Sequence, residues 1–135
     1  MRPGKGTTTM QTSYLSGRVR SFGHAWRGLM LLLQTQPNAR IHALATVLVV
    51  AAGALFGITP AEWALIVLSM VCVWAAEALN TAVEFVVDLA SPEHHPLAGK
   101  AKDVAAGAVL VAAIGSVIVG VFVFGPCVLE LFRRG

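Results

Sequence analysis

Apolar stretches separated by short polar ones run along most of the chain and predict helices that cross a membrane. Residues 41–58 carry no charge over 18 positions, or about 27 Å at 1.5 Å per residue, and residues 104–124 carry none over 21. A third uncharged stretch, residues 63–76, has 14 residues, or about 21 Å, which is too short to cross a hydrocarbon core of about 30 Å. The helix that contains this stretch must therefore carry Glu77 into the membrane.

Signals that begin and end helices set the bounds of these spans. Pro37 interrupts the chain before the first stretch, and the Thr-Pro-Ala-Glu sequence at residues 59–62 combines a capping box with a proline in the first helical position. The first two spans should therefore form a tight hairpin. A Ser-Pro pair at 91–92 ends the second span, and a Gly-Pro pair at 125–126 ends the third. We predict membrane helices at residues 41–58, 61–90 and 102–125.

Residues 18–36 have a different pattern, with a single apolar face. The apolar residues that recur at helical spacing are Phe22, Trp26, Leu29, Met30 and Leu33. The pattern predicts an amphipathic helix in the interface of an anionic leaflet, although it also fits a helix packed on a soluble core. Residues 1–17 lack an apolar run and are expected to form a mobile cytoplasmic tail, which leaves residues 18–135 as one membrane domain.

Composition supports lipid as the solvent of this chain. Of its 135 residues 56% are hydrophobic and only 13% are charged, against about 25% charged in a typical soluble domain. The net charge of +3 comes from basic residues with no run longer than two, so nucleic acid is not expected as a partner. Eight of the ten basic residues lie in the N-terminal segment or in the second loop, which predicts a cytoplasmic N-terminus.

The second predicted span carries a stripe of polar residues. Glu77, Asn80, Glu84 and Asp88 are spaced three, four and four residues apart, so all four lie on one face of the helix. Carboxylates are costly in lipid, and the stripe must therefore face protein, a metal or a wet cavity. Because one chain with three spans can hardly enclose such a stripe, we expect a homo-oligomer with the site in a groove between helices.

Depth in the membrane assigns different chemistry to the residues of the stripe. Glu77 lies about 25 Å along its helix, just inside the membrane, and is suited to accept a proton. The wetter Glu84 is suited to bind Mg²⁺. Lys102 and Asp103 lie at the same surface, and a lysine for phosphate with carboxylates for a metal and a base are the components of phosphoryl transfer.

Two segments of the sequence match the motifs of a known family. The first runs from Glu77 to Asp88 as E-x-x-N-x-x-x-E-x-x-x-D, and the second runs from His95 to Ala108 and contains A-K-D. With weaker likeness upstream, the match covers residues 22–124. In these motifs the chain resembles the prokaryotic diacylglycerol kinase and undecaprenol kinase family of small membrane enzymes.

The resemblance implies a homotrimer of three-helix subunits in the bacterial inner membrane, which transfers the γ-phosphate of ATP to a lipid hydroxyl with Mg²⁺. Glu77 corresponds to the general base, and Glu77 and Asn80 to residues that hold the lipid. Glu84 corresponds to the metal ligand, while many members have a second metal-binding Glu where this chain has the weaker ligand Gln36. The residues that correspond to nucleotide contacts are Glu84, Glu93, His94, His95, Lys102 and Asp103.

Other interpretations of these residues exist. The motif wording favours undecaprenol over diacylglycerol as the acceptor, but both branches share the stripe. Intramembrane carboxylates also occur in ion or proton pathways, although the uncharged residues 63–76 leave no acidic group near the bilayer middle. A purely structural helical scaffold gives no reason to bury Glu77. Taken alone, Lys102 is typical of a lysine that fixes topology, and His94 or His95 of an exposed loop.

Overall fold

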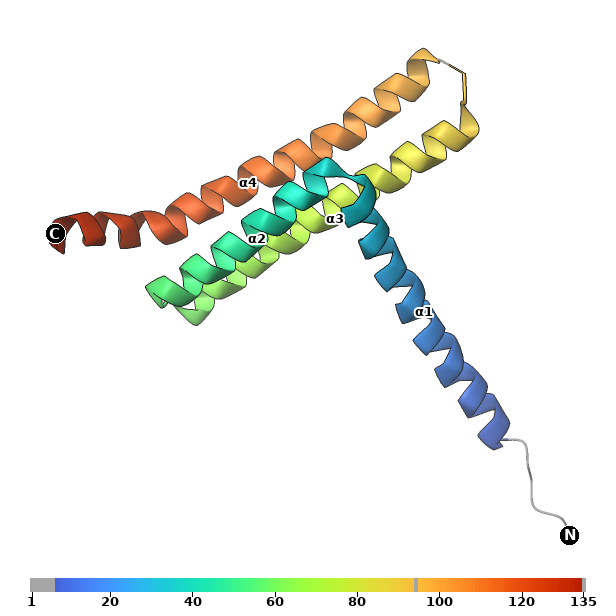
Figure 1. Cartoon of the computed structure of the whole chain (residues 1–135), viewed down its shortest axis with the longest axis horizontal. Helices are drawn as coiled ribbons and strands as arrows, with labels where there is room; N and C mark the ends of the chain where they lie inside the picture. The colour runs from blue at the N-terminus through green and yellow to red at the C-terminus, as the bar shows by residue number, and fades with distance from the viewer. Residues whose placement is uncertain (1–6, 94, 135) are drawn as a thin grey trace, which may run out of the picture. The chain divides into compact units, whose positions relative to one another are not determined.

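The computed structural model describes residues 7–93 and 95–134, with side chains from residue 20 onward, and every regular element in these residues is a helix. The helices are α1 (Thr7–Thr35), α2 (Pro37–Phe56), α3 (Pro60–Ala90) and α4 (Pro96–Arg134) (Figure 1). The helices α2, α3 and α4, of 20, 31 and 39 residues, are long and apolar enough to cross a bilayer. The prediction of an all-α membrane protein with three spanning helices and an N-terminal helix is confirmed.

The chain divides into two units, residues 1–35 and residues 36–135. The first unit contains α1, which begins at Thr7 rather than at residue 18. Residues 7–17, predicted to be a tail, are therefore helical, because they contain no proline and only one glycine to interrupt the backbone. Residues 1–6 of the predicted tail lie outside the described residues. That residues 18–135 form one membrane domain stays a prediction.

The turn between α2 and α3 follows the predicted capping pattern. Gly57 ends α2 in the left-handed conformation, with φ of 63°, which costs little without a Cβ. Thr59 caps α3: its Oγ1 accepts a hydrogen bond from the N–H of Glu62 at 3.3 Å, and Glu62 accepts one from the N–H of Thr59 at 2.7 Å. The predicted tight hairpin is confirmed.

Close packing of a glycine holds this hairpin together. A Cβ placed on Gly53 would lie 2.8 Å from two ring atoms of Trp63 and 3.1 Å from Ile58. Ile58 belongs, with Ile66 and Val123, to the buried apolar cluster at this end of the three-helix unit. The glycine therefore allows α2 to approach the start of α3.

We expect Gly53→Ala to destabilise the folded protein by about 1–3 kcal/mol, because the rigid indole must move out of the cluster. Thermal unfolding in detergent, followed by circular dichroism, measures the change. Gly115→Ala is the matched control, since nothing lies within 4 Å of a Cβ at Gly115 on α4. An equal melting temperature for both variants would contradict this account of the hairpin.

Helix α4 is longer than predicted at both ends. It begins at Pro96, in the first position where proline is tolerated, and it continues through Pro126 instead of ending at 125. Pro126 removes one backbone donor, but Val123 and Phe124 just before it pack in the apolar cluster and hold the helix in place. Figure 1 shows the last turns of α4, in red, running in a different direction from the orange part.

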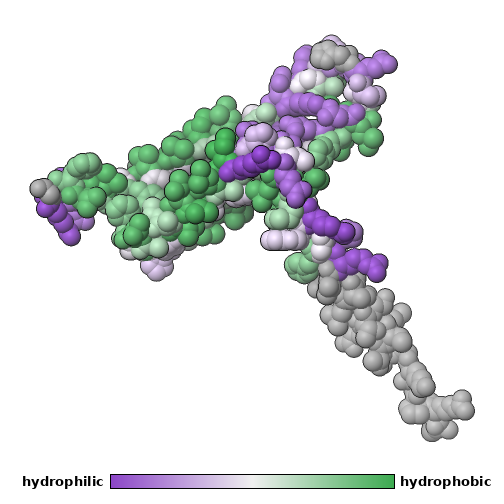
Figure 2. All heavy atoms as spheres, viewed as in Figure 1, coloured by the Kyte–Doolittle hydropathy of each residue, from purple (hydrophilic) through white to green (hydrophobic). Residues whose placement is uncertain are grey.

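Polar residues of the three-helix unit gather where α3 ends and α4 begins, and a second group lies at the end of α4 (Figure 2). Helix α3 packs mainly against α4 and also against α2. Figure 2 shows hydrophilic residues where α3 ends and α4 begins, and hydrophobic residues along the length of these helices. The polar end contains the predicted site residues, while the apolar cluster lies toward the other end.

Candidate functional site

The chain buries the deeper half of the polar stripe by itself. Glu77 is 1% exposed, and Asn80 is 6% exposed, because α3 packs between α2 and α4 at this level. The side chain of Asp88, about three turns beyond Glu77 along α3, is 64% exposed. The expectation that one chain could hardly enclose the stripe is therefore wrong for Glu77 and Asn80, and their burial does not require a second copy.

The Glu77 carboxyl has an oxygen without a hydrogen-bond partner among the described residues. This oxygen, Oε2, is buried, and leaving it unpaired costs about 1–3 kcal/mol or more for a charged group. His42 and Glu84 interact with the carboxyl electrostatically. An acceptor held away from water in this way is suited to receive a proton from a bound hydroxyl.

Two amides bind the carboxylate of Glu84. Gln36, which precedes α2, donates from Nε2 to Oε2 of Glu84 at 3.4 Å, and Asn80 donates from Nδ2 to Oε1 at 3.1 Å. The Oδ1 atom of Asn80 is buried and has no partner among the described residues. The structure thus brings Gln36, at the start of α2, together with Asn80 and Glu84 of α3.

Glu84 is the one carboxylate in this group that could bind Mg²⁺. Among the described residues no three His, Cys, Asp or Glu side chains cluster as a metal site would require by itself. Mg²⁺ in phosphoryl-transfer enzymes commonly uses one or two carboxylates and completes its shell with water and phosphate oxygens. Glu84 fits this pattern as the one carboxylate, and the amide nitrogens of Gln36 and Asn80 hold it in place.

The residues predicted to bind the nucleotide lie at the exposed end. Lys102 on α4 is half-buried and forms an ion pair with Asp88 on α3, while Asp103 is exposed. In the loop that joins these helices Glu93 and His95 are exposed, and His95 accepts a hydrogen bond at Nδ1 from the N–H of Leu97. The predicted contact at His94 lies outside the described residues.

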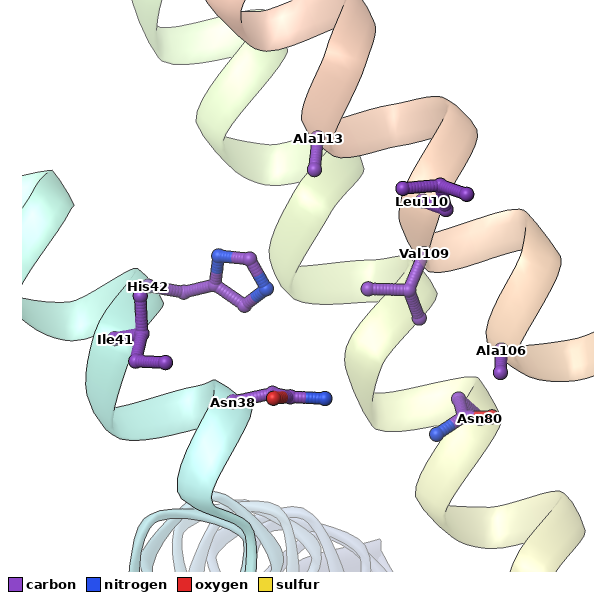
Figure 3. A pocket seen from close by; sticks show the side chains of 8 residues that line it. All are labelled: Asn38, Ile41, His42, Asn80, Ala106, Val109, Leu110 and Ala113. Carbon is purple, nitrogen blue, oxygen red and sulfur yellow. The ribbon is translucent and has the colours of Figure 1, made fainter.

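A cavity of about 260 Å³ lies beside the stripe, between α2, α3 and α4 (Figure 3). Its lining residues are Asn38, Ile41, His42, Asn80, Ala106, Val109, Leu110 and Ala113. Sequence analysis assigned no role to Asn38 and His42. The signal was present, because two polar residues four apart at the start of an apolar span share one helix face.

Three membrane-spanning helices with buried carboxyl and amide groups beside a cavity define a helical membrane protein with a polar site near one end of its spans. The family model of prokaryotic diacylglycerol kinase matches residues 23–124. The chain belongs to this family. The match covers nearly the same residues as the resemblance seen in the sequence.

Curated relatives of the chain agree with this family. The chain is 44% identical over 107 residues to the undecaprenol kinase of Bacillus subtilis, covering 79% of this chain and 87% of that protein. It is 45% identical over 112 residues to a diacylglycerol kinase of Synechocystis, covering 82% of this chain but 64% of that protein. It is 33% identical over 100 residues to the diacylglycerol kinase of Escherichia coli, covering 74% of this chain and 82% of that protein.

Proposed function

We propose that this lipid kinase transfers the γ-phosphate of ATP to the hydroxyl of undecaprenol or diacylglycerol, at the cytoplasmic surface of the bacterial inner membrane. The observation that carries the proposal is the buried Glu77 oxygen without a partner, next to Asn80 and the Glu84 group, in a chain of this family. The motifs shared with the undecaprenol kinase branch favour undecaprenol.

Glu77 and Asn80 act on the acceptor in this proposal. Asn80 holds the lipid hydroxyl, and Glu77 takes its proton as the hydroxyl oxygen bonds to the γ-phosphorus. The bond from that phosphorus to the bridging oxygen breaks, ADP leaves with the electron pair, and Glu77 later releases the proton to water. Burial of Glu77 excludes water, which would otherwise compete with the lipid for the phosphoryl group.

The donor side lies nearer the cytoplasm. Lys102 leaves its ion pair with Asp88 and neutralises charge on the phosphates of ATP. The rest of ATP is contacted by Asp103 and by the loop residues Glu93, His94 and His95. Mg²⁺ would be held by Glu84, with help from Gln36, and would neutralise charge on the phosphate oxygens. A homotrimer with each N-terminus in the cytoplasm and α1 along the membrane surface completes the proposal.

A phosphoryl-transfer assay tests this function directly. The purified chain in detergent, given labelled ATP, Mg²⁺ and either undecaprenol or diacylglycerol, should form a labelled lipid phosphate. The same chain in liposomes should show no proton flux in the absence of ATP turnover. Proton flux without labelled lipid would favour the ion-pathway function over the kinase.

A further inference from the structure

A hydrogen bond within the membrane-spanning helices joins the side chains of Trp74 and Thr46. The indole Nε1 of Trp74 on α3 donates to Oγ1 of Thr46 on α2 at 3.1 Å. That hydroxyl in turn donates to the backbone carbonyl of His42, one turn earlier on α2, at 2.8 Å. Because polar groups in hydrocarbon have no water to bind, such a bond between helices is costly to lose. The pair therefore fixes one point of α2 against α3.

Close packing does not set the position of α2 at this level. A small cavity of about 50 Å³ lies beside the pair, and His42 and Ser116 of α4 share its lining with Trp74 and Thr46. Its volume is that of one or two water molecules at about 30 Å³ each. Helix α3 also packs less against α2 than against α4. Since side chains leave this space open, the hydrogen bond holds the middle of α2 where it is.

This bond lies midway between two other connections of α2 to α3. Near the start of α2, Gln36 donates to Glu84 at 3.4 Å, and Thr46 is ten residues, or about 15 Å, further along the chain. At the other end α2 stops at the hairpin turn of Gly57, eleven residues or about 16 Å beyond Thr46. Without the middle bond, α2 can rotate or bow between these two ends.

Rotation of α2 would reach the candidate site directly. Thr46 and His42 are four residues apart and share one face of α2, and Figure 3 shows His42 pointing toward α3. Glu77 follows Trp74 by three residues, or about 4.5 Å, on α3 and interacts electrostatically with His42. The hydrogen bond and this interaction are therefore about one turn apart on both helices. A rotation that broke the bond would carry His42 away from Glu77.

We propose, on the basis of the kinase function above, that Trp74 is a positioning residue: through Thr46 it holds α2 in the rotation that keeps His42 beside Glu77. Trp74 contacts no substrate in this role. His42 sets part of the electrostatic environment in which Glu77 takes up the hydroxyl proton. The residues proposed to contact the nucleotide belong to α3, α4 and the loop between them. Loss of the bond should therefore lower kcat and leave KM for ATP unchanged.

The test measures kcat, and KM for ATP, in the purified full chain with undecaprenol as the acceptor. Trp74→Phe keeps an aromatic ring without the N–H, and Thr46→Val keeps the branched shape without the hydroxyl. Each should lower kcat about tenfold, and the double variant should be no lower than either, because both remove the same bond. Thr46→Ser keeps the acceptor and should recover most of the loss. Ser69→Ala is the matched control, since the Ser69 hydroxyl donates within α3, to the carbonyl of Ile66 at 2.9 Å.

A cycle with His42 separates positioning from a general loss of stability. In a His42→Ala background, Trp74→Phe should change kcat by less than about twofold, because the residue that it positions is gone. Heteronuclear NMR of the indole N–H groups reports on the bond itself. Thr46→Val should move the Trp74 signal and leave the signals of Trp26 and Trp63 unchanged.

Three results would overturn the role of Trp74. They are a kcat of Trp74→Phe within about threefold of wild type, an equal loss in the His42→Ala background, and an indole signal that does not move in Thr46→Val. Each of them leaves the kinase function standing. Wild type that phosphorylates neither undecaprenol nor diacylglycerol would refute the kinase function, and the positioning role with it.

Discussion

Replacing Glu77 by glutamine is expected to lower kcat for lipid phosphorylation by about 10²–10⁴-fold, the usual contribution of a general base. Glutamine has the same shape as glutamate. The side chains packed around Glu77, which is 1% exposed, should therefore keep their positions. The oxygen without a partner becomes part of an amide that cannot take up the hydroxyl proton. Initial rates at saturating ATP and lipid, in detergent, measure the effect.

The melting temperature separates chemistry from folding in this variant. Removing a buried charge without a hydrogen-bond partner should leave stability unchanged or raise it, because the desolvation cost disappears. Glu130→Gln is the matched control, since Glu130 is 65% exposed and pairs with Arg134 at the far end of α4. A Glu77→Gln variant with activity within about threefold of the control would exclude Glu77 as the base.

The elements that the sequence predicted well are those with local signals. The hairpin between α2 and α3 depends on Gly57 and on the box formed by Thr59 and Glu62, all within six residues. The ends of α4 were predicted poorly because the local signals there were not decisive. Pro126 is a local stop signal, yet tertiary packing of Val123 and Phe124 overrides it. Local patterns do not report how strongly neighbouring helices hold a segment.

The candidate site divides in the same way. The spacing of Glu77, Asn80 and Glu84 on one face of α3 could be read from helical geometry alone. The helix that covers that face could not be predicted. Helical spacing puts Asn38 and His42 on one face of α2, but only the cavity shows that they share its lining with Asn80. Whether every one of these residues takes part in catalysis stays a prediction. The sequence indicated that Gln36 is a weaker metal ligand than a glutamate would be. Its contact with Glu84 allows this to be tested by exchanging the two residues.

Glu84→Gln should lower activity by about a hundredfold at a fixed Mg²⁺ concentration, because the group then holds three amides and no carboxylate. Gln36→Glu should act in the opposite direction and lower the Mg²⁺ concentration for half-maximal activity about tenfold. The double exchange, Gln36→Glu with Glu84→Gln, moves the carboxylate across a contact of 3.4 Å. Its activity should be at least about tenfold higher than that of Glu84→Gln alone. Activity measured against Mg²⁺ concentration distinguishes the three variants.

Stability supplies an independent readout for the same exchange. Gln36 is the N-cap of α2, where a negative charge is favoured by about 0.3–1 kcal/mol, but in Gln36→Glu that charge faces Glu84. Mg²⁺ should therefore raise the melting temperature of Gln36→Glu more than that of wild type, since it relieves the repulsion between two carboxylates. Ser91→Glu, which adds a carboxylate seven residues beyond Glu84, is the matched control and should show no added response. If Mg²⁺ shifts both variants equally, Gln36 and Glu84 do not form the metal site, and the cation must be bound through the nucleotide alone.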